Sequence, residues 1–227
     1  MEDSTIFINC QYMNKIRSAH SDSGMKGILK FSWAYSLFSD LISDKSKTAS
    51  LMEQLCQINS KSRILDIGCG PGSFVKYLPK TVDGYLGIDM NENYIEYAND
   101  KWSNREDVNF IQGTVGELDI RDFDKYDVVV AKALVHHLSD EHAKQLFSFA
   151  AQVLNQGGIF VTYDNVFIEN QHWFAKWLIK NDRGKYVRTQ EEYTKLVALY
   201  FNNLTTQVLH DTLRIPYTIL TIRCSNN

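Results

Sequence analysis

The 227-residue chain is predicted to form one α/β domain on a doubly wound, mostly parallel sheet. An apolar run at 63–67 passes directly into a loop with three glycines, Gly68, Gly70 and Gly72, before a helical pattern resumes. From there on, short apolar stretches alternate with helical patterns, which is typical of parallel strands joined by right-handed crossovers. The length suits one well-buried core and is short for two.

Composition and charge narrow the function classes. Hydrophobic residues make up 44% and charged residues 22% of the chain, as in ordinary globular proteins. The formal net charge of -3 provides no overall basic field, so nucleic acid is not an expected partner. Four cysteines without a Cys-x-x-Cys pair indicate reduced thiols, and no metal site is expected. No apolar stretch has the length of a membrane span, so we expect a cytoplasmic protein without a membrane partner.

Two helices are predicted before the first strand. One covers about 25–42 and carries a cluster of aromatic residues, and the second covers about 48–58 with leucines directed at the sheet. Stripes of apolar residues at this spacing usually pack in a core. Residues 1–60 are therefore expected to form a helical cover over the sheet.

Five parallel strands and three helices are predicted through the centre of the chain. The strands are expected at 63–67, 84–89, 108–112, 126–131 and 157–163, and the helices near 72–79, 91–103 and 139–155. Asn91 and Ser139 occupy positions where an N-cap is wanted, and Asp140 and Glu141 occupy a first helical turn. Gly157-Gly158 is expected to end the long helix as a C′ glycine.

The remaining chain predicts two more helices and a closing pair of strands. Helical patterns cover about 171–182 and 189–201. The last two apolar stretches, 204–209 and 217–224, alternate in the manner of an antiparallel pair.

A second strand tip supports the reading of the glycine loop as a ligand site. The stretch 85–89 is another short apolar strand that ends in a carboxylate, Asp89, 23 residues beyond Asp66. A dinucleotide loop, Gly-x-Gly-x-x-Gly, would need a third glycine where Ser73 stands. Instead, 66–72 resembles motif I of the class I S-adenosylmethionine-dependent methyltransferases, an acidic residue followed by x-Gly-x-Gly-x-Gly. The resemblance covers about 60–163.

This resemblance implies a Rossmann-like, seven-stranded sheet with the last strand antiparallel, and S-adenosylmethionine as the cofactor. The glycine loop would lie beside the methionine part, Asp89 would hold the ribose hydroxyls, and Met90 would contact the adenine. Relatives often place an acidic residue after the third strand; here Thr114 stands in that place, with Glu117 as an alternative. The residues assigned to the cofactor are Asp66, Gly68, Cys69, Gly70, Gly72, Asp89, Met90, Thr114, Val115, Ala131 and Lys132.

Two adjacent histidines, His136 and His137, follow the fourth strand. With the Ser-Asp-Glu at 139–141 they resemble a segment of small-molecule methyltransferases. Histidine suits a general base because this residue type gains and loses a proton near neutral pH. We expect His136 to be the base, with His137 as the competitor. The alternative is that both histidines are structural residues with their hydrogen bonds satisfied beneath the start of a helix. Many relatives need no base and act only by holding the acceptor close to the methyl group.

The charged segment after the fifth strand offers candidates for substrate contacts. Family members build substrate pockets there, and N-terminal helices often help to select the substrate. The candidates are Tyr35, Arg183, Tyr186 and Arg188. A charged turn in which the arginines pair with Glu191 and Glu192 is the preferred interpretation of this segment, and ordinary packing is the preferred interpretation of Tyr35.

The expected function is transfer of a methyl group to an oxygen, less readily a nitrogen or carbon, of a small molecule. An aminopropyltransferase would carry carboxylates after the fourth strand, and 131–137 holds none. A non-catalytic S-adenosylmethionine-binding or scaffold protein is the third interpretation. Within one domain, the expected parts are the helical cover at 1–60, the cofactor-binding core at 61–163, a helical insertion near the substrate at 164–203, and the closing strands at 204–227.

Overall fold

The computed structural model describes residues 45–181, 184–210 and 217–226. In these ranges the chain forms the strands β1 (Arg63–Ile67), β2 (Gly84–Asp89), β3 (Val108–Gln112), β4 (Tyr126–Lys132), β5 (Leu154–Phe167), β6 (Arg188–Thr189), β7 (Asn203–Leu209) and β8 (Ile219–Ser225). The α-helices there are α3 (Lys45–Cys56), α4 (Glu92–Lys101), α5 (Asp140–Val153), α6 (Trp173–Asn181) and α7 (Gln190–Val197), and the 3-10 helices are η1 (Ser73–Tyr77), η2 (Ile120–Asp122) and η3 (Val135–His137). The helix predicted over 25–42 lies outside the described residues. None of the described helices combines the length and the apolar character needed to cross a membrane.

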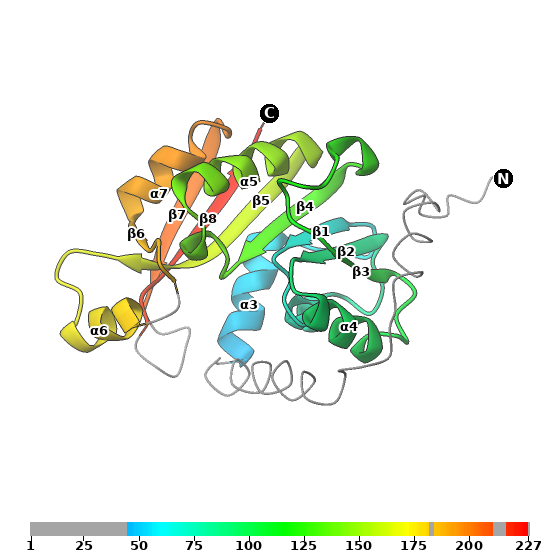
Figure 1. The fold of residues 1–227 in the computed structure, drawn as a ribbon, viewed down its shortest axis with the longest axis horizontal. Helices are drawn as coiled ribbons and strands as arrows, with labels where there is room; N and C mark the ends of the chain where they lie inside the picture. The colour runs from blue at the N-terminus through cyan, green and yellow to red at the C-terminus, as the bar shows by residue number, and fades with distance from the viewer. Residues whose placement is uncertain (1–44, 182–183, 211–216, 227) are drawn as a thin grey trace.

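The described strands form one sheet with the order β3-β2-β1-β4-β5-β8-β7, and β6 pairs with β5 beside this path (Figure 1). Strands β1 to β5 run parallel, and β8 runs antiparallel to both of its neighbours. This confirms the predicted doubly wound sheet with an antiparallel last strand, while the sequence pattern does not predict the two-residue β6. The order reverses between β1 and β4, and ligands of such sheets bind beyond the carboxyl ends of strands at this switch point.

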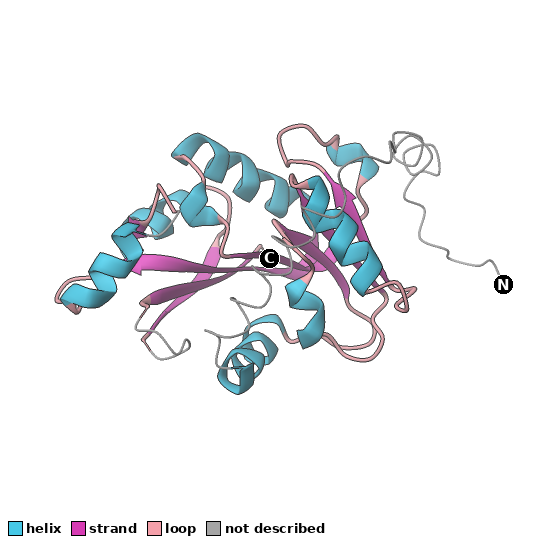
Figure 2. Ribbon diagram, turned by 60° about the horizontal axis from the view of Figure 1, so that its bottom comes forward, coloured by secondary structure: helices cyan, strands magenta, loops and turns pink. Residues whose placement is uncertain are grey.

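Helices cover both faces of the sheet (Figure 2). Leu65 and Ile67 of β1 share an apolar cluster with residues of α5 and α7, whereas Ile64 shares another with residues of α3, η1 and α4. Alternate side chains of one strand thus enter opposite clusters, as the period of two in a strand requires. Ile64 and Leu65 are fully buried, which explains why β1 reads as a continuous apolar run.

The helix predicted over 72–79 is wrong in type and length. Only the five-residue 3-10 helix η1 forms there, and it ends at Tyr77. Leu78 is already extended, with φ -76° and ψ 152°, because a proline disfavours helical backbone in the residue that precedes it. The glycine loop therefore leads into a single short turn, so ligand binding there would depend on the loop amides rather than on an α-helix dipole.

The junction between α5 and β5 also differs from the prediction. Helix α5 ends at Val153, and Leu154 is extended with φ -71° and ψ 141°, so Gly157-Gly158 does not cap the helix. Gly157, with φ 77°, lies within β5, near the point where the register against β4 shifts between Tyr126 and Val128. Glycine allows the backbone to adopt the irregular conformation that this register shift requires. Strand β5 consequently starts earlier and ends later than the predicted 157–163.

The predicted helix starts are confirmed. The Asn91 side chain accepts a hydrogen bond from the N–H of Asn93 at 3.1 Å, and the Ser139 hydroxyl accepts one from the N–H of His142 at 3.4 Å. These bonds satisfy amide groups that have no partner inside the helix. Both helices begin at the carboxyl edge of the sheet, α4 directly after β2 and α5 after η3.

Candidate cofactor and catalytic site

The glycine loop folds back onto the tip of β2. Gly68, Gly70 and Gly72 all have positive φ, at 72°, 54° and 69°, a region that other residues enter only with strain. The Gly70 N–H donates to Asp89 Oδ2 at 2.9 Å, and the Asn91 N–H donates to Asp89 Oδ1 at 2.9 Å. A Cβ at Gly70 would meet nothing within 4 Å, so the loop presents open backbone at this point.

Asp89 holds the loop and remains able to bind a ligand. Burial raises the pKa of its carboxyl group, and the N–H groups of Asn91 and Gly70 partly offset that rise by favouring the charged form. Each carboxylate oxygen has two lone pairs, and one amide donor on each oxygen leaves further acceptor positions. The side chain can therefore accept hydrogen bonds from a pair of hydroxyl groups.

A cavity of about 560 Å³ lies beside Asp89. It brings together five of the predicted cofactor residues: Gly68, Asp89, Met90, Thr114 and Val115. Met90 is 72% exposed, and the alternative acidic residue Glu117 also lines the cavity. The other predicted residues lie outside the lining: Asp66, Cys69, Gly70, Gly72, Ala131 and Lys132.

Residues of α5 and the loop before it line the opposite wall of this cavity, and the sequence reasoning did not assign them. Leu134, Leu138, His142 and Gln145 belong to this group. A Cβ at Gly68 would lie 2.9 Å from the methyl groups of Leu134, so the missing side chain at Gly68 makes room for that leucine. The helical pattern of α5 alone does not identify its first turn as a wall of the cavity.

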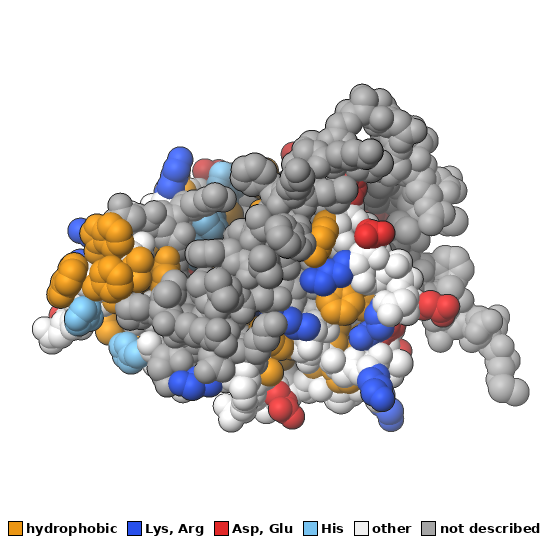
Figure 3. Space-filling view, turned by 90° about the horizontal axis from the view of Figure 1, so that it is seen from below, with side chains coloured by type: hydrophobic (Ala, Val, Ile, Leu, Met, Phe, Trp, Pro, Cys, Tyr) orange, Lys and Arg blue, Asp and Glu red, His pale blue; other side chains and the backbone are white. Residues whose placement is uncertain are grey.

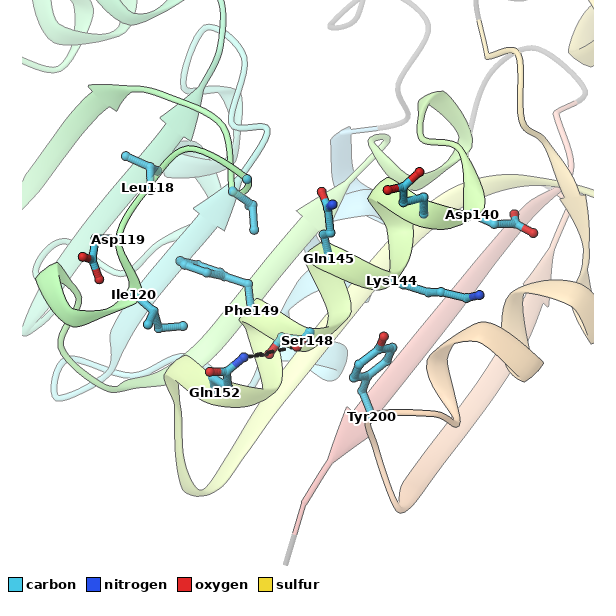
Figure 4. Close-up of a pocket in the computed structure, with 13 residues that line it drawn as sticks. Leu118, Asp119, Ile120, Asp140, Lys144, Gln145, Ser148, Phe149, Gln152 and Tyr200 are labelled. Carbon is cyan, nitrogen blue, oxygen red and sulfur yellow. Dashed lines mark hydrogen bonds between the residues drawn. The ribbon is translucent and has the colours of Figure 1, made fainter.

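A larger and shallower cavity of about 910 Å³ adjoins the first and shares Val115, Gly116 and Gln145 with it. Figure 4 shows residues of its wall: Phe149 points from α5 toward Ile120, and Tyr200 lies on the other side of α5 from Phe149. It is not bounded by the tips of β1 and β2. We therefore place the candidate cofactor site in the smaller cavity.

Asp66, predicted to contact the cofactor, is instead buried beneath the loop. It is 2% exposed and accepts a hydrogen bond from the Tyr85 hydroxyl at 2.7 Å. Burial raises its pKa to about 7, although the bond from Tyr85 and the positive charge of Lys132 lower it. In the described structure Asp66 therefore contacts Tyr85 of β2 and does not line the cavity.

This raised pKa predicts a pH dependence of stability. In an unfolded chain an aspartate titrates near pH 4, so the folded state binds this proton more tightly. The contribution of Asp66 to stability is therefore full below about pH 4, and is lost as pH rises to about 7. Asp66→Asn should remove this decrease in the free energy of unfolding. The decrease amounts to at most about 1.4 kcal/mol for each unit by which the folded pKa exceeds the unfolded pKa. Urea unfolding from pH 4 to 8 measures it.

The control for this prediction is Asp100→Asn, which makes the same change at an exposed position of α4. It should leave the pH profile of the wild type unchanged. A profile of Asp66→Asn that runs parallel to the wild-type profile would contradict the prediction.

His136 forms a buried pair with Asp164, a residue of β5 that the sequence reasoning did not single out. The Asp164 carboxylate oxygen Oδ1 lies 2.8 Å from His136 Nδ1 and accepts the His136 backbone N–H at 3.2 Å. The two residues are 4% and 3% exposed. If Nδ1 carries the proton, the ring presents Nε2 as an acceptor. His137 is exposed, and its ring lies 4.2 Å from that of His136 between centroids.

The segment from Gly184 to Arg188 packs against this histidine. The Tyr186 N–H donates to the His136 carbonyl at 3.0 Å. A Cβ at Gly184 would overlap His136 Cδ2, so only glycine fits against this edge of the ring. Tyr186 itself is 44% exposed. The substrate candidates Tyr35 and Arg183 lie outside the described residues.

Arg188 does not face an open substrate mouth, because its guanidinium group is already bound on several sides. It donates to Asp140 Oδ1 at 2.6 Å, to the Leu138 carbonyl at 2.8 Å and to the Tyr186 carbonyl at 2.9 Å. The residue is 7% exposed. Arg188 does not form the alternative pairing with the glutamates of α7 either: Glu191 pairs with Lys195, and Glu192 completes the capping box of α7.

Comparison with known proteins shows similarity to methyltransferases. Residues 64–158 match the family model of a methyltransferase domain. The methyltransferase YcgJ of Bacillus subtilis is 30% identical over 51% of this chain and 45% of its own length. The phosphoethanolamine N-methyltransferase of Plasmodium falciparum is 26% identical over 68% of this chain and 59% of its own length. The chain thus spans about half the length of the curated relatives that it matches.

Solved structures show the same fold. The crystal structure of YcgJ superposes with a TM-score of 0.62 at 18% identity, covering 79% of this chain and 98% of that one. Geranyl diphosphate C-methyltransferase of Streptomyces coelicolor, solved with S-adenosyl-L-homocysteine, superposes with a TM-score of 0.65 at 14% identity, covering 81% and 78%. Together with the sheet order and the glycine loop, these matches show that residues 64–158 resemble a methyltransferase domain and that the chain has the Rossmann-like fold of the class I S-adenosylmethionine-dependent methyltransferases.

Proposed function

We propose that this chain binds S-adenosylmethionine and transfers its methyl group to an oxygen, less readily a nitrogen or carbon, of a small-molecule acceptor. One observation carries the proposal: the Gly70 N–H binds Asp89 at 2.9 Å, which joins the glycine loop to a carboxylate on the wall of a cavity of about 560 Å³. A cavity of this size suits a ligand as large as a nucleoside derivative.

The residues that line the cavity fit the chemistry of the cofactor. Asp89 can accept the two ribose hydroxyls, and Met90 offers a soft, polarizable surface to the adenine ring. Thr114 is less available than expected, because its hydroxyl donates to Glu117 Oε2 at 3.0 Å. We therefore assign the adenine amino group to this pair rather than to Thr114 alone.

The cofactor supplies a methyl group on a sulfonium centre that is already activated, so the protein has to align the acceptor and remove its proton. We propose that His136 Nε2 takes the proton of an acceptor hydroxyl and that Asp164 holds the ring in the required tautomer. The contact between His136 Nδ1 and Asp164 supports this assignment, because it leaves the other ring nitrogen as an acceptor.

Calorimetry of S-adenosylmethionine binding tests the cofactor assignment. Asp89→Ala should weaken binding by about 1–3 kcal/mol, the scale for losing hydrogen bonds to a charged group. Asp83→Ala is the matched control, because Asp83 is exposed and pairs with Arg63 away from the cavity. Equal affinity in the wild type and Asp89→Ala would remove Asp89 from the ribose site. Tight binding of NAD without binding of S-adenosylmethionine would overturn the function.

Turnover is tested by a screen of a metabolite pool with S-adenosylmethionine that carries a labelled methyl group. Formation of S-adenosylhomocysteine together with a labelled product is the expected result, and the product identifies the acceptor. Binding without turnover across the pool would favour a non-catalytic S-adenosylmethionine-binding protein. Transfer of an aminopropyl group would instead favour the aminopropyltransferase-like enzyme.

A further inference from the structure

Helix α6 exposes a group of large aromatic side chains, here called the α6 aromatic face: Trp173, Phe174 and Trp177. Their exposed fractions are 73%, 37% and 54%. The rings of Phe174 and Trp177 are stacked, with centroids 5.9 Å apart, and Trp173 meets Phe174 edge to face at 5.6 Å. Figure 3 shows hydrophobic side chains gathered at the end of the molecule where Figure 1 places α6. Contiguous apolar surface of this kind marks an interaction site.

The opposite side of α6 is fixed to the protein, so the aromatic face is held outward. Ala175 and Ile179 are 4% and 1% exposed, and their i, i+4 spacing places them on one side of the helix. Before the helix, the Gln171 side chain donates to the Val166 carbonyl at 3.1 Å. The helix therefore cannot turn its tryptophans into the core without giving up this buried side.

Positive charges accompany the aromatic face. Lys176 and Lys180 are both exposed, and helical spacing places them next to Trp173 and Trp177. Helix α6 itself contains no aspartate or glutamate, with Glu169 before it and Asp182 after it in the sequence, and the whole chain has a formal net charge of -3. Helix α6 is thus a cationic, aromatic element on a protein with a net negative charge.

We propose that α6 docks on the surface of an anionic lipid bilayer. Tryptophan and phenylalanine rings favour the boundary between headgroups and acyl chains, and adjacent lysines can reach lipid phosphates. A second copy of the chain fits less well, because a two-fold contact through this face would bring the lysines of both copies together. The expectation of no membrane partner rested on the lack of a spanning segment, and an interfacial helix needs none.

Sedimentation of the full chain with vesicles tests the proposal. Vesicles that mix phosphatidylglycerol with phosphatidylcholine should bind the protein more tightly than pure phosphatidylcholine does. The double variant Trp173→Ser, Trp177→Ser should lower the partition coefficient at least about 10-fold. Lys176→Gln and Lys180→Gln should each lower it about 5-fold at low salt, and only on vesicles that contain phosphatidylglycerol.

Two control variants change an exposed apolar residue and an exposed lysine elsewhere on the surface. Leu199→Ser removes a side chain that is 64% exposed, and Lys80→Gln removes an exposed cation. Both should bind vesicles like the wild type. Failure of the wild type to sediment with either vesicle, or equal sedimentation of the aromatic variant, overturns the proposal. Light scattering that shows a dimer in the wild type and a monomer in the aromatic variant, without vesicle binding, also overturns it and assigns the face to a second copy.

Discussion

Replacing His136 by alanine is expected to lower methyl transfer about 10²–10⁴-fold, the range for losing acid–base assistance. The expected cause is loss of the ring nitrogen that accepts the acceptor proton, since the other nitrogen lies 2.8 Å from Asp164. Affinity for S-adenosylmethionine should stay unchanged, because His136 does not line the cavity beside Asp89. Single-turnover rates with the acceptor found in the screen, together with calorimetry, measure both effects.

Three further measurements separate catalysis from packing. His210→Ala removes an exposed histidine in the short segment after β7 and should leave turnover unchanged. Asp164→Asn keeps the size of the positioning residue and should give a rate between those of the wild type and His136→Ala. Added imidazole should partly restore His136→Ala. Near-normal turnover of His136→Ala at every pH would contradict the assignment of the base without contradicting the proposed methyl transfer.

The sheet could be predicted because its strands carry strong local signals. The run at 63–67 is apolar at nearly every position, and its fully buried residues enter clusters on both faces. The predicted helix bounds are wrong where one or two residues override the surrounding helical pattern. The proline at 79 stops a helical pattern early, and the glycines at 157–158 belong to an irregular strand rather than to a helix end.

The candidate site was only partly predictable, because its polar pairs join distant segments. Asp89 follows a strand tip at a fixed distance from the glycine loop, so spacing alone predicts that they meet. Asp164 lies 28 residues from His136, near the carboxyl end of a largely buried strand, and nothing local marks it as a partner. Gly184 reads as a turn glycine, yet its missing side chain makes room for the His136 ring.

Arg188→Ala is expected to lower the free energy of unfolding by about 2–4 kcal/mol, although Arg188 is one of the substrate candidates from the sequence. The guanidinium group joins β6 to the start of α5 through Asp140 and the carbonyl of Leu138, and it also donates to the Val135 carbonyl at 3.3 Å. Its loss leaves buried carbonyl groups without this donor and a space beside the Tyr193 ring, which lies 5.5 Å from the guanidinium carbon. Urea unfolding measures the change.

Two variants show whether this loss comes from the buried network. Lys195→Ala removes an ion pair with Glu191 on the exposed side of α7 and should leave the free energy of unfolding close to that of the wild type. Arg188→Lys should recover only part of the stability, because an ammonium group cannot donate in the directions of a planar guanidinium. An unchanged unfolding free energy in Arg188→Ala, together with a raised KM for the acceptor, would contradict the structural role and return Arg188 to the substrate site.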